Sequence, residues 1–146
     1  MTTLENIVEM TNHHVRSIDP DAMLIDAIAS MCEHHVRALL VGELTEPVGI
    51  VSERDVLERA VLIRLDPSVT KVKDVMTSPL VWLPVDCTAP EALEFLRVRH
   101  LHQVPVMSEE AVIGIVSATD LLRWARRSTE VEIQSLTEYC SRRYPS

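Results

Sequence analysis

The 146-residue sequence is poor in aromatic residues, glycine and long apolar runs. Only 3% of the chain is aromatic while 47% is hydrophobic, so a core has to be built from Val, Leu, Ile, Ala and Met. No apolar run approaches the length of about 18 residues that a membrane span needs. The acidic N-terminal stretch does not resemble a signal peptide. We therefore expect a soluble cytoplasmic protein.

Cysteine and positive charge are also scarce. The three cysteines, Cys32, Cys87 and Cys140, are odd in number and lack C-x-x-C spacing, which fits a reduced intracellular protein better than a disulfide scaffold. A net charge of −8 argues against a general nucleic-acid surface. A weaker alternative is RNA or DNA binding through a local arginine cluster at Arg123, Arg126, Arg127, Arg142 and Arg143.

Because glycine is rare, two kinds of catalytic loop are excluded. The only glycines are Gly42, Gly49 and Gly114, and their spacing does not form a glycine-rich phosphate loop. Neither Ser52 nor Ser117 has the flanking glycines of a G-x-S-x-G nucleophile elbow. We therefore expect no enzyme activity.

What the chain does contain is an internal duplication. Residues 49–55 read G-I-V-S-E-R-D and residues 114–120 read G-I-V-S-A-T-D. At this offset residues 15–59 align with residues 80–124 without a gap, and ten positions are identical. A fixed-period repeat of this kind is the first feature to interpret in a sequence.

Each repeat predicts the element order β-α-β-β-α. In the first repeat we expect strands at 15–18, 38–41 and 48–51 and helices at 22–34 and 53–63. In the second we expect strands at 103–106 and 111–116 and helices at 88–100 and 118–126. The second repeat's first helix has a well-defined start, a T-x-x-E capping box from Thr88 to Glu91.

The predicted fold class is α/β, with two half-size units. The domain boundaries that follow are a first repeat with its lead-in at 1–64, a linker at 65–69, a second repeat at 70–126 and a C-terminal helical tail at 127–146. The second lead-in is Val72–Thr77, which resembles residues 7–11. A unit of about 60 residues is marginal alone, so the halves should pack on each other.

The corner that ends each G-I-V-S stretch has two interpretations. In the structural one, the Ser caps the next helix and the Asp three residues later returns a hydrogen bond to the backbone. In the functional one, free backbone N–H groups and the helix dipole attract phosphate. The carboxylate then accepts hydrogen bonds from both hydroxyls of a ribose, and Ile50 or Ile115 lies against a flat base.

The six histidines do not form a metal-binding pattern. Adjacent histidines point apart on a strand and about 100° apart on a helix, so the pairs His13-His14 and His34-His35 chelate poorly. No cysteine or carboxylate lies at metal-ligand spacing beside them. We expect no metal site. The equivalence of His35 and His100 in the two repeats favours a structural or ligand-facing role.

Together these features resemble the paired CBS domains, named for cystathionine β-synthase, over roughly residues 7–125. The resemblance depends on the duplication, the element order, the G-I-V-[ST]-x-x-D corner in both repeats and an H-x-x-P-V element at 102–106. It implies two tandem CBS repeats packed with pseudo-twofold symmetry. It also implies a regulatory module that binds AMP, ADP, ATP or S-adenosylmethionine in clefts between the repeats.

The family pattern also implies roles for single residues. Asp120 and Asp55 are expected to bind ribose hydroxyls. The other implied ligand residues are Ser117, Thr119, Ser52 and Arg54 for phosphates, Ile115 and Ile50 for adenine, and His102 with its first-repeat counterpart Arg37 for phosphate.

The two repeats depart from each other near the expected phosphates. The first repeat has no counterpart of Pro105. Arg54 and Arg37 suit a polyphosphate, whereas Thr119 and His102 suit a monophosphate.

The predicted function is a non-catalytic regulator that senses an adenine nucleotide, needs no obligatory cofactor, forms a homodimer and signals to an unidentified target protein. The alternative is a ligand-free dimerisation or protein-interaction scaffold. Cys87 lies near a helix start, where a thiol pKa can be lowered. We expect it to be a small filler residue instead.

Overall fold

The computed structural model describes residues 2–11 and 14–125 of the chain. They form two compact units, each with a three-stranded sheet, so the α/β prediction is confirmed. The first-repeat unit comprises residues 15–81 with 110–112. Of the described residues, the second-repeat unit joins 2–11 and 14 to residues 82–109 and 113–125.

The first-repeat unit is built on the sheet order β1-β2-β3. Strand β1 runs parallel to β2, and β2 runs antiparallel to β3 with Leu39 opposite Val51. Its elements are β1 (Ser17–Ile18), α2 (Leu24–His34), β2 (Ala38–Gly42), β3 (Pro47–Ser52), α3 (Glu53–Val56), the π-helical turn η1 (Leu57–Val61) and the 3-10 turn η2 (Val72–Asp74). Its core is aliphatic, as expected.

Two helices of this unit differ from the prediction. Helix α2 begins at Leu24 and not at residue 22, because Met23 is extended and pairs with Lys71. The single helix expected at 53–63 is instead one turn of α-helix followed by the π-helical turn η1. Four apolar side chains in and after this turn are exposed: Leu57, Val61, Leu62 and Ile63.

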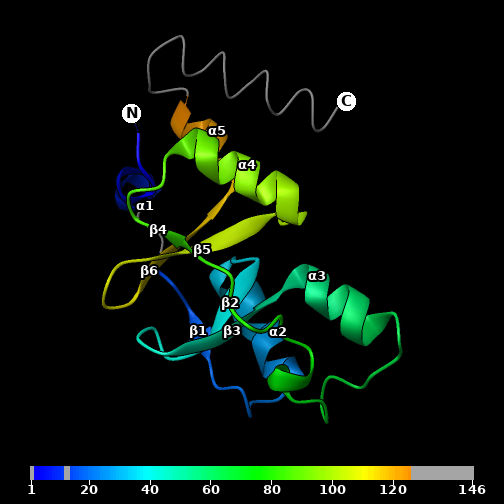
Figure 1. Cartoon of the computed structure of the whole chain (residues 1–146). Helices are drawn as coiled ribbons and strands as arrows, with labels where there is room; N and C mark the ends of the chain where they lie inside the picture. The colour runs from blue at the N-terminus through cyan, green and yellow to red at the C-terminus, as the bar shows by residue number, and fades with distance from the viewer. Residues whose placement is uncertain (1, 12–13, 126–146) are drawn as a thin grey trace. The chain divides into compact units, whose positions relative to one another are not determined.

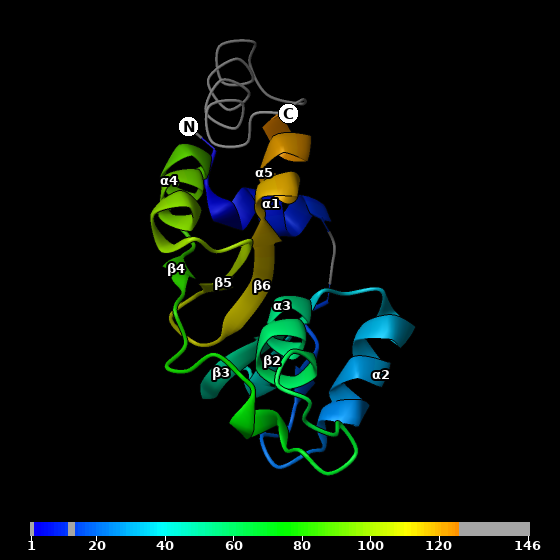
Figure 2. The same cartoon turned by 90° about the vertical axis from the view of Figure 1, so that its right-hand side faces the viewer.

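The second-repeat unit repeats this plan with the sheet order β4-β5-β6. Helices α1, α4 and α5 lie together on one side of the sheet, and α5 packs against both α1 and α4 (Figures 1 and 2). The elements are α1 (Leu4–Thr11), β4 (Leu83–Pro84), α4 (Ala89–Arg99), β5 (Gln103–Met107), β6 (Val112–Ser117) and α5 (Ala118–Ala125).

The two lead-ins pack on the repeats they do not precede. Helix α1, at the start of the chain, buries Leu4 and Ile7 completely in the core of the second-repeat unit. The segment before the second repeat buries Val72 and Val75 in the core of the first-repeat unit. The sequence-based boundaries therefore describe the repeats and cut across the compact units.

His35 and His100 have the structural role that their equivalence allowed. They end α2 and α4 in the left-handed conformation, with φ of 54° and 55°. Such a residue closes the C-terminus of a helix and directs the chain into the next strand. The repeated histidine thus marks a repeated helix cap.

Two further expectations concern the C-terminal tail and membrane-spanning helices. The helical tail predicted at 127–146 lies outside the described residues. Within the described ranges, no helix is both long and apolar enough to cross a bilayer.

Candidate functional site

The first corner lies where β3 ends and α3 begins. Ser52 is extended, with φ −117° and ψ 167°, and its Oγ accepts a hydrogen bond from Asp55 N at 3.2 Å. Asp55 Oδ2 accepts in return from Ser52 N at 2.9 Å and from Ser52 Oγ at 3.0 Å. The predicted cap is therefore confirmed, because these bonds form a reciprocal capping box.

The second corner, between β6 and α5, has the same reciprocal pair. Asp120 N donates to Ser117 Oγ at 3.1 Å, and Ser117 N donates to Asp120 Oδ2 at 2.9 Å. In both corners the capping bonds engage the Oδ2 atom of the carboxylate. The corners differ in what reaches the other oxygen, Oδ1.

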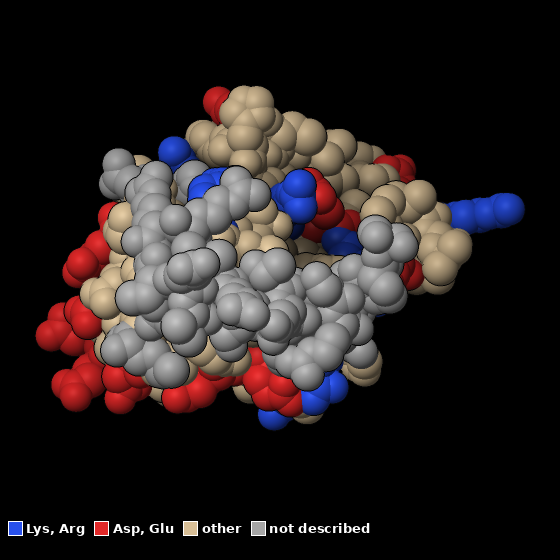
Figure 3. Space-filling model, turned by 90° about the horizontal axis from the view of Figure 1, so that it is seen from above, with Lys and Arg blue, Asp and Glu red and all other residues tan. Residues whose placement is uncertain are grey.

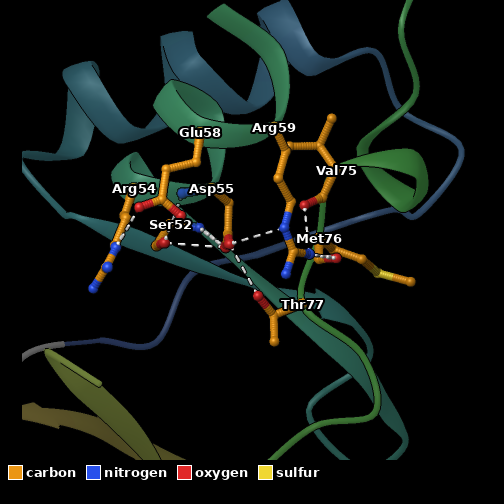
Figure 4. Close-up of polar contacts among 8 residues, drawn as sticks. All are labelled: Ser52, Arg54, Asp55, Glu58, Arg59, Val75, Met76 and Thr77. Atoms are coloured by element: carbon orange, nitrogen blue, oxygen red, sulfur yellow. Dashed lines mark hydrogen bonds and ion pairs between the residues drawn. The ribbon is translucent and has the colours of Figure 1, made fainter. Parts of the chain in front are cut away.

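At the first corner, Oδ1 is engaged by a residue distant in sequence and approached by one from the next helical turn. Thr77 Oγ1 donates to Asp55 Oδ1 at 2.9 Å, and Arg59 Nε lies 4.0 Å from the same oxygen (Figure 4). Asp55 is only 9% exposed. Both carboxylate oxygens of Asp55 are therefore engaged by the protein itself.

At the second corner, no residue that the structure describes donates to Oδ1. Among the residues that the structure describes, only Ser117 exchanges hydrogen bonds with the Asp120 side chain, and it does so through Oδ2. Asp120 is half-buried. One oxygen of this carboxylate can therefore accept new hydrogen bonds without displacing a donor from the described part of the chain.

The structure brings the other first-repeat candidates close to the first corner. Arg37 is exposed, and its backbone carbonyl accepts from Glu53 N at 3.0 Å. Arg54 Nε donates to Glu58 Oε1 at 2.8 Å on the surface of the turn. Ile50 is half-buried on β3 and pairs through its backbone with Thr77. Arg54 is thus an ion-paired side chain.

The second-repeat candidates surround their corner in the same order. Thr119 is exposed in the first turn of α5, and Ile115 is half-buried on β6. His102 is exposed directly before β5, the strand next to β6. Each unit therefore presents its own five predicted residues on neighbouring elements.

Sequence reasoning missed Thr77 and Arg59 as partners of Asp55. Thr77 belongs to the lead-in segment that the alignment matched with residues 7–11, but similarity between two lead-ins does not show which repeat each contacts. Arg59 lies four residues after Asp55, a helical spacing that allows an ion pair. That spacing was the one local signal available.

Cys87 is a buried filler. Burial, followed by the negative charge of Glu91, raises the pKa of its thiol to about 11. Its Sγ lies 3.6 Å from Thr88 O. Because a thiol with this pKa stays protonated at neutral pH, the lowered-pKa alternative for Cys87 is wrong.

Charge and metal ligands add no further site in the described part of the chain. The described residues contain no group of three or more His, Cys, Asp or Glu side chains that could hold a metal ion. In the view of Figure 3, acidic side chains crowd one edge, while Lys and Arg occur singly or in small groups. Of the predicted arginine cluster, only Arg123 lies within the described residues.

Comparisons with known proteins agree with the repeat architecture. The CBS domain family model matches residues 5–62 and 72–127. A mitochondrial CBS domain-containing protein of Arabidopsis thaliana is 31% identical over 82% of this chain and 60% of its own length. The chain spans 60–61% of this and two archaeal relatives.

Solved structures show the same fold. A crystal structure of a CBS domain superposes with a TM-score of 0.79 at 27% identity, over 86% of this chain and 98% of that one. Hypoxic Response Protein I, solved with two coordinated zinc ions, gives 0.71 at 26% identity over 85% and 99% of the two chains. Two three-stranded sheets with their helices are therefore the tandem CBS arrangement.

Proposed function

The chain belongs to the CBS domain family, whose members are generally regulatory modules that bind adenosine ligands, and we propose that it senses such a ligand for a partner protein. Its stand-alone homologues are generally regulatory and non-catalytic. The proposed ligands are AMP, ADP, ATP and S-adenosylmethionine. The unidentified partner reads the change in packing that the ligand stabilises.

One observation carries this proposal: the carboxylate of Asp120 is held in place at a strand-to-helix corner through one oxygen, and no described residue donates to the other. Ser117 orients Asp120 through Oδ2, which leaves Oδ1 for a vicinal diol. The backbone N–H groups at the start of α5 and the positive end of its dipole favour a phosphate nearby. A ribose phosphate presents both chemistries within one small molecule.

The proposed ligand contacts follow the two corners. By the corner motif alone both Asp120 and Asp55 are candidate diol acceptors, and Asp120 is the favoured one because none of the described residues donates to its Oδ1, whereas Thr77 donates to Asp55 Oδ1. The remaining candidates are Ser117, Thr119 and His102 with Ile115 in the second repeat, and Ser52, Arg54 and Arg37 with Ile50 in the first.

The test is thermal unfolding with millimolar AMP, ADP, ATP, S-adenosylmethionine or NAD. A ligand at 100 times its Kd adds about 2.7 kcal/mol, which moves the midpoint by several degrees. We expect Asp120→Ala to abolish the shift, while Asp86→Ala, an exposed carboxylate in the same unit, keeps it. A midpoint that none of these ligands moves would favour the scaffold function.

The scaffold function is supported by the exposed apolar side chains at η1. Leu62 is 76% exposed, and Leu57, Val61 and Ile63 around it are exposed as well. Since an apolar patch of this kind marks an interface in soluble proteins and CBS proteins often form oligomers, we assign it to a second copy of the chain.

Sedimentation of the purified protein tests this assignment. We expect a wild-type dimer, a monomer for Leu62→Asp, and a dimer for Val98→Asp, which adds the same charge at an exposed site on α4. A wild-type monomer at all concentrations would contradict it.

A further inference from the structure

We infer that the two corners are not equivalent ligand sites: Asp55 is a latch that holds segment 75–77 against β3, and Asp120 is the one carboxylate open to a diol. The second half of this inference depends on the proposed nucleotide binding. The first half is a statement about the protein alone, and it can be tested without any ligand.

Most acceptor positions of the Asp55 carboxylate are already filled. A carboxylate offers about four acceptor positions. Asp55 accepts from Ser52 N, Ser52 Oγ and Thr77 Oγ1, and Arg59 Nε lies 4.0 Å away. A ribose diol needs two positions on one carboxylate, so at this corner it has to displace Thr77. The displaced hydroxyl then loses its partner, which opposes binding.

Segment 75–77 cannot easily withdraw from Asp55. Thr77 and Ile50 exchange two backbone hydrogen bonds, of 2.8 and 3.1 Å. Arg59 Nη1 donates to Met76 O at 2.8 Å and to Val75 O at 3.3 Å (Figure 4). The segment also passes so close to Gly49 that an added Cβ would lie 2.6 Å from Thr77 O. Thr77, the donor to Asp55, is therefore held by its backbone bonds to Ile50 and by the bonds from Arg59 to the two residues before it. The close approach to Gly49 leaves no room for a side chain between the segment and β3.

Within the described residues, the second corner has no counterpart of this latch. Its lead-in is helix α1, in which Thr11 Oγ1 donates to Val8 O at 3.1 Å. Trp124, the repeat counterpart of Arg59, donates to Met10 Sδ at 2.9 Å. Both side chains therefore stay with the helix, and none of the described residues donates to Asp120 Oδ1.

The consequence is one nucleotide per chain. The latch also fixes the segment directly before the chain leaves the first-repeat unit at Val81. Asp55 therefore helps to fix the position of that segment. It occupies the same motif position as Asp120 but has a different role.

Calorimetric titration with AMP, and separately with ATP, tests the open corner. We expect one site in the wild type and at least about tenfold weaker binding in Asp120→Asn, since bonds to a charged acceptor are lost. Asp55→Asn should keep the wild-type Kd. Two sites per chain, or loss of binding in Asp55→Asn, would overturn the inference.

A double-mutant cycle on the unfolding midpoint tests the latch. We expect Thr77→Val and Asp55→Ala each to lower the midpoint by several degrees and the double variant to fall well short of their sum. Thr77→Ser keeps the hydroxyl, so its unfolding midpoint should stay near that of the wild type. If Asp55→Ala does not fold, the comparison of Thr77→Ser with Thr77→Val still tests the bond. The latch would be overturned if the two midpoint changes were additive in the double variant, or if Thr77→Ser lowered the midpoint as much as Thr77→Val does.

These two experiments fail in different ways. If no nucleotide binds the wild type at millimolar concentration, the proposed function and the open corner are both wrong, while the cycle still decides on the latch. If nucleotide binds at two equal sites, the proposed function holds and this inference is wrong.

Discussion

The two corners share a motif and a capping geometry, yet their lead-ins make them different. At the first corner the lead-in is the 3-10 turn η2 followed by a bend, and Thr77 at its end pairs with Ile50 of β3, so that the threonine hydroxyl reaches Asp55. At the second corner the lead-in is helix α1, which packs through Leu4 and Ile7. The state of each carboxylate therefore depends on a segment outside the repeat.

Polar contacts also hold the lead-in that reaches the first corner. Lys73 and Lys71 lie 3.0 and 3.6 Å from Asp21, and the hydrogen bond from Lys73 lowers the pKa of this exposed carboxyl. Both lead-ins bury apolar side chains, Val72 and Val75 in one and Leu4 and Ile7 in the other. What separates them is that segment 72–77 also brings a side-chain donor, Thr77 Oγ1, to its corner.

The largest expected effect on stability comes from truncating a buried side chain of helix α1. Ile7 is completely buried, so Ile7→Ala should cost about 2–5 kcal/mol of unfolding free energy. Denaturant unfolding measures this loss. Glu9→Ala, on the exposed side of α1, is the matched control and should change little. An Ile7→Ala variant as stable as the control would show that α1 is not held by its buried side chains.

The glycines that face each lead-in offer a sharper comparison. In Gly49→Ala the new Cβ meets the backbone oxygen of Thr77 at 2.6 Å, whereas in Gly114→Ala it meets Val8 side-chain atoms at 2.8 Å. We expect losses of about 1–3 kcal/mol for both, measured by denaturant unfolding.

Only the second of these losses should be repairable. Adding Val8→Ala to Gly114→Ala removes the clash and should recover part of the stability, while no side-chain change relieves a backbone clash at Gly49. If Val8→Ala gives no recovery, the helical lead-in does not approach Gly114 as described.

A smaller effect is expected at Arg59. Arg59→Met keeps the stem but removes the donors to Met76 O and Val75 O, which should cost about 1 kcal/mol because the side chain is half exposed. Arg59→Lys keeps the charge and should lose less. Thermal unfolding ranks the three proteins, and a Lys variant less stable than the Met variant would contradict the role of these bonds.

The smallest effect is expected for glycine at the helix cap that the two repeats share. His35 is left-handed at φ 54°, so His35→Gly should be neutral or stabilising by about 0.5 kcal/mol, while His35→Val should destabilise by about 1–2 kcal/mol. His100→Gly should change the stability in the same direction. A stable His35→Val variant, seen in the same unfolding assay, would argue against the helix-cap role.

Local signals explain how much of this molecule was predictable. The element order follows from the duplication and from short apolar strands, and the caps at Ser52 and Ser117 follow from a Ser with an acid three residues later. Such signals act over a few residues. They could not predict the π-helical turn after Val56, whose side chains carry the same apolar pattern as a longer α-helix.

The bond from Thr77 to Asp55 could not be predicted for a different reason. It joins residues 22 positions apart, and nothing local indicates that residues 72–77 pack on the repeat that precedes them. The corner motif alone assigns the same role to Asp55 and Asp120. Only the tertiary contacts of the two lead-ins separate them.

The central claim is that nucleotide binds at the Asp120 corner and not at the Asp55 corner. Its most direct test is a titration of the 15N-labelled protein with AMP, following the backbone N–H signals of both corners by NMR. The account predicts saturable shifts at Ser117, Thr119 and Asp120, with Ser52 and Asp55 unmoved. Equal shifts at both corners, or shifts at Ser52 and Asp55 alone, would contradict it.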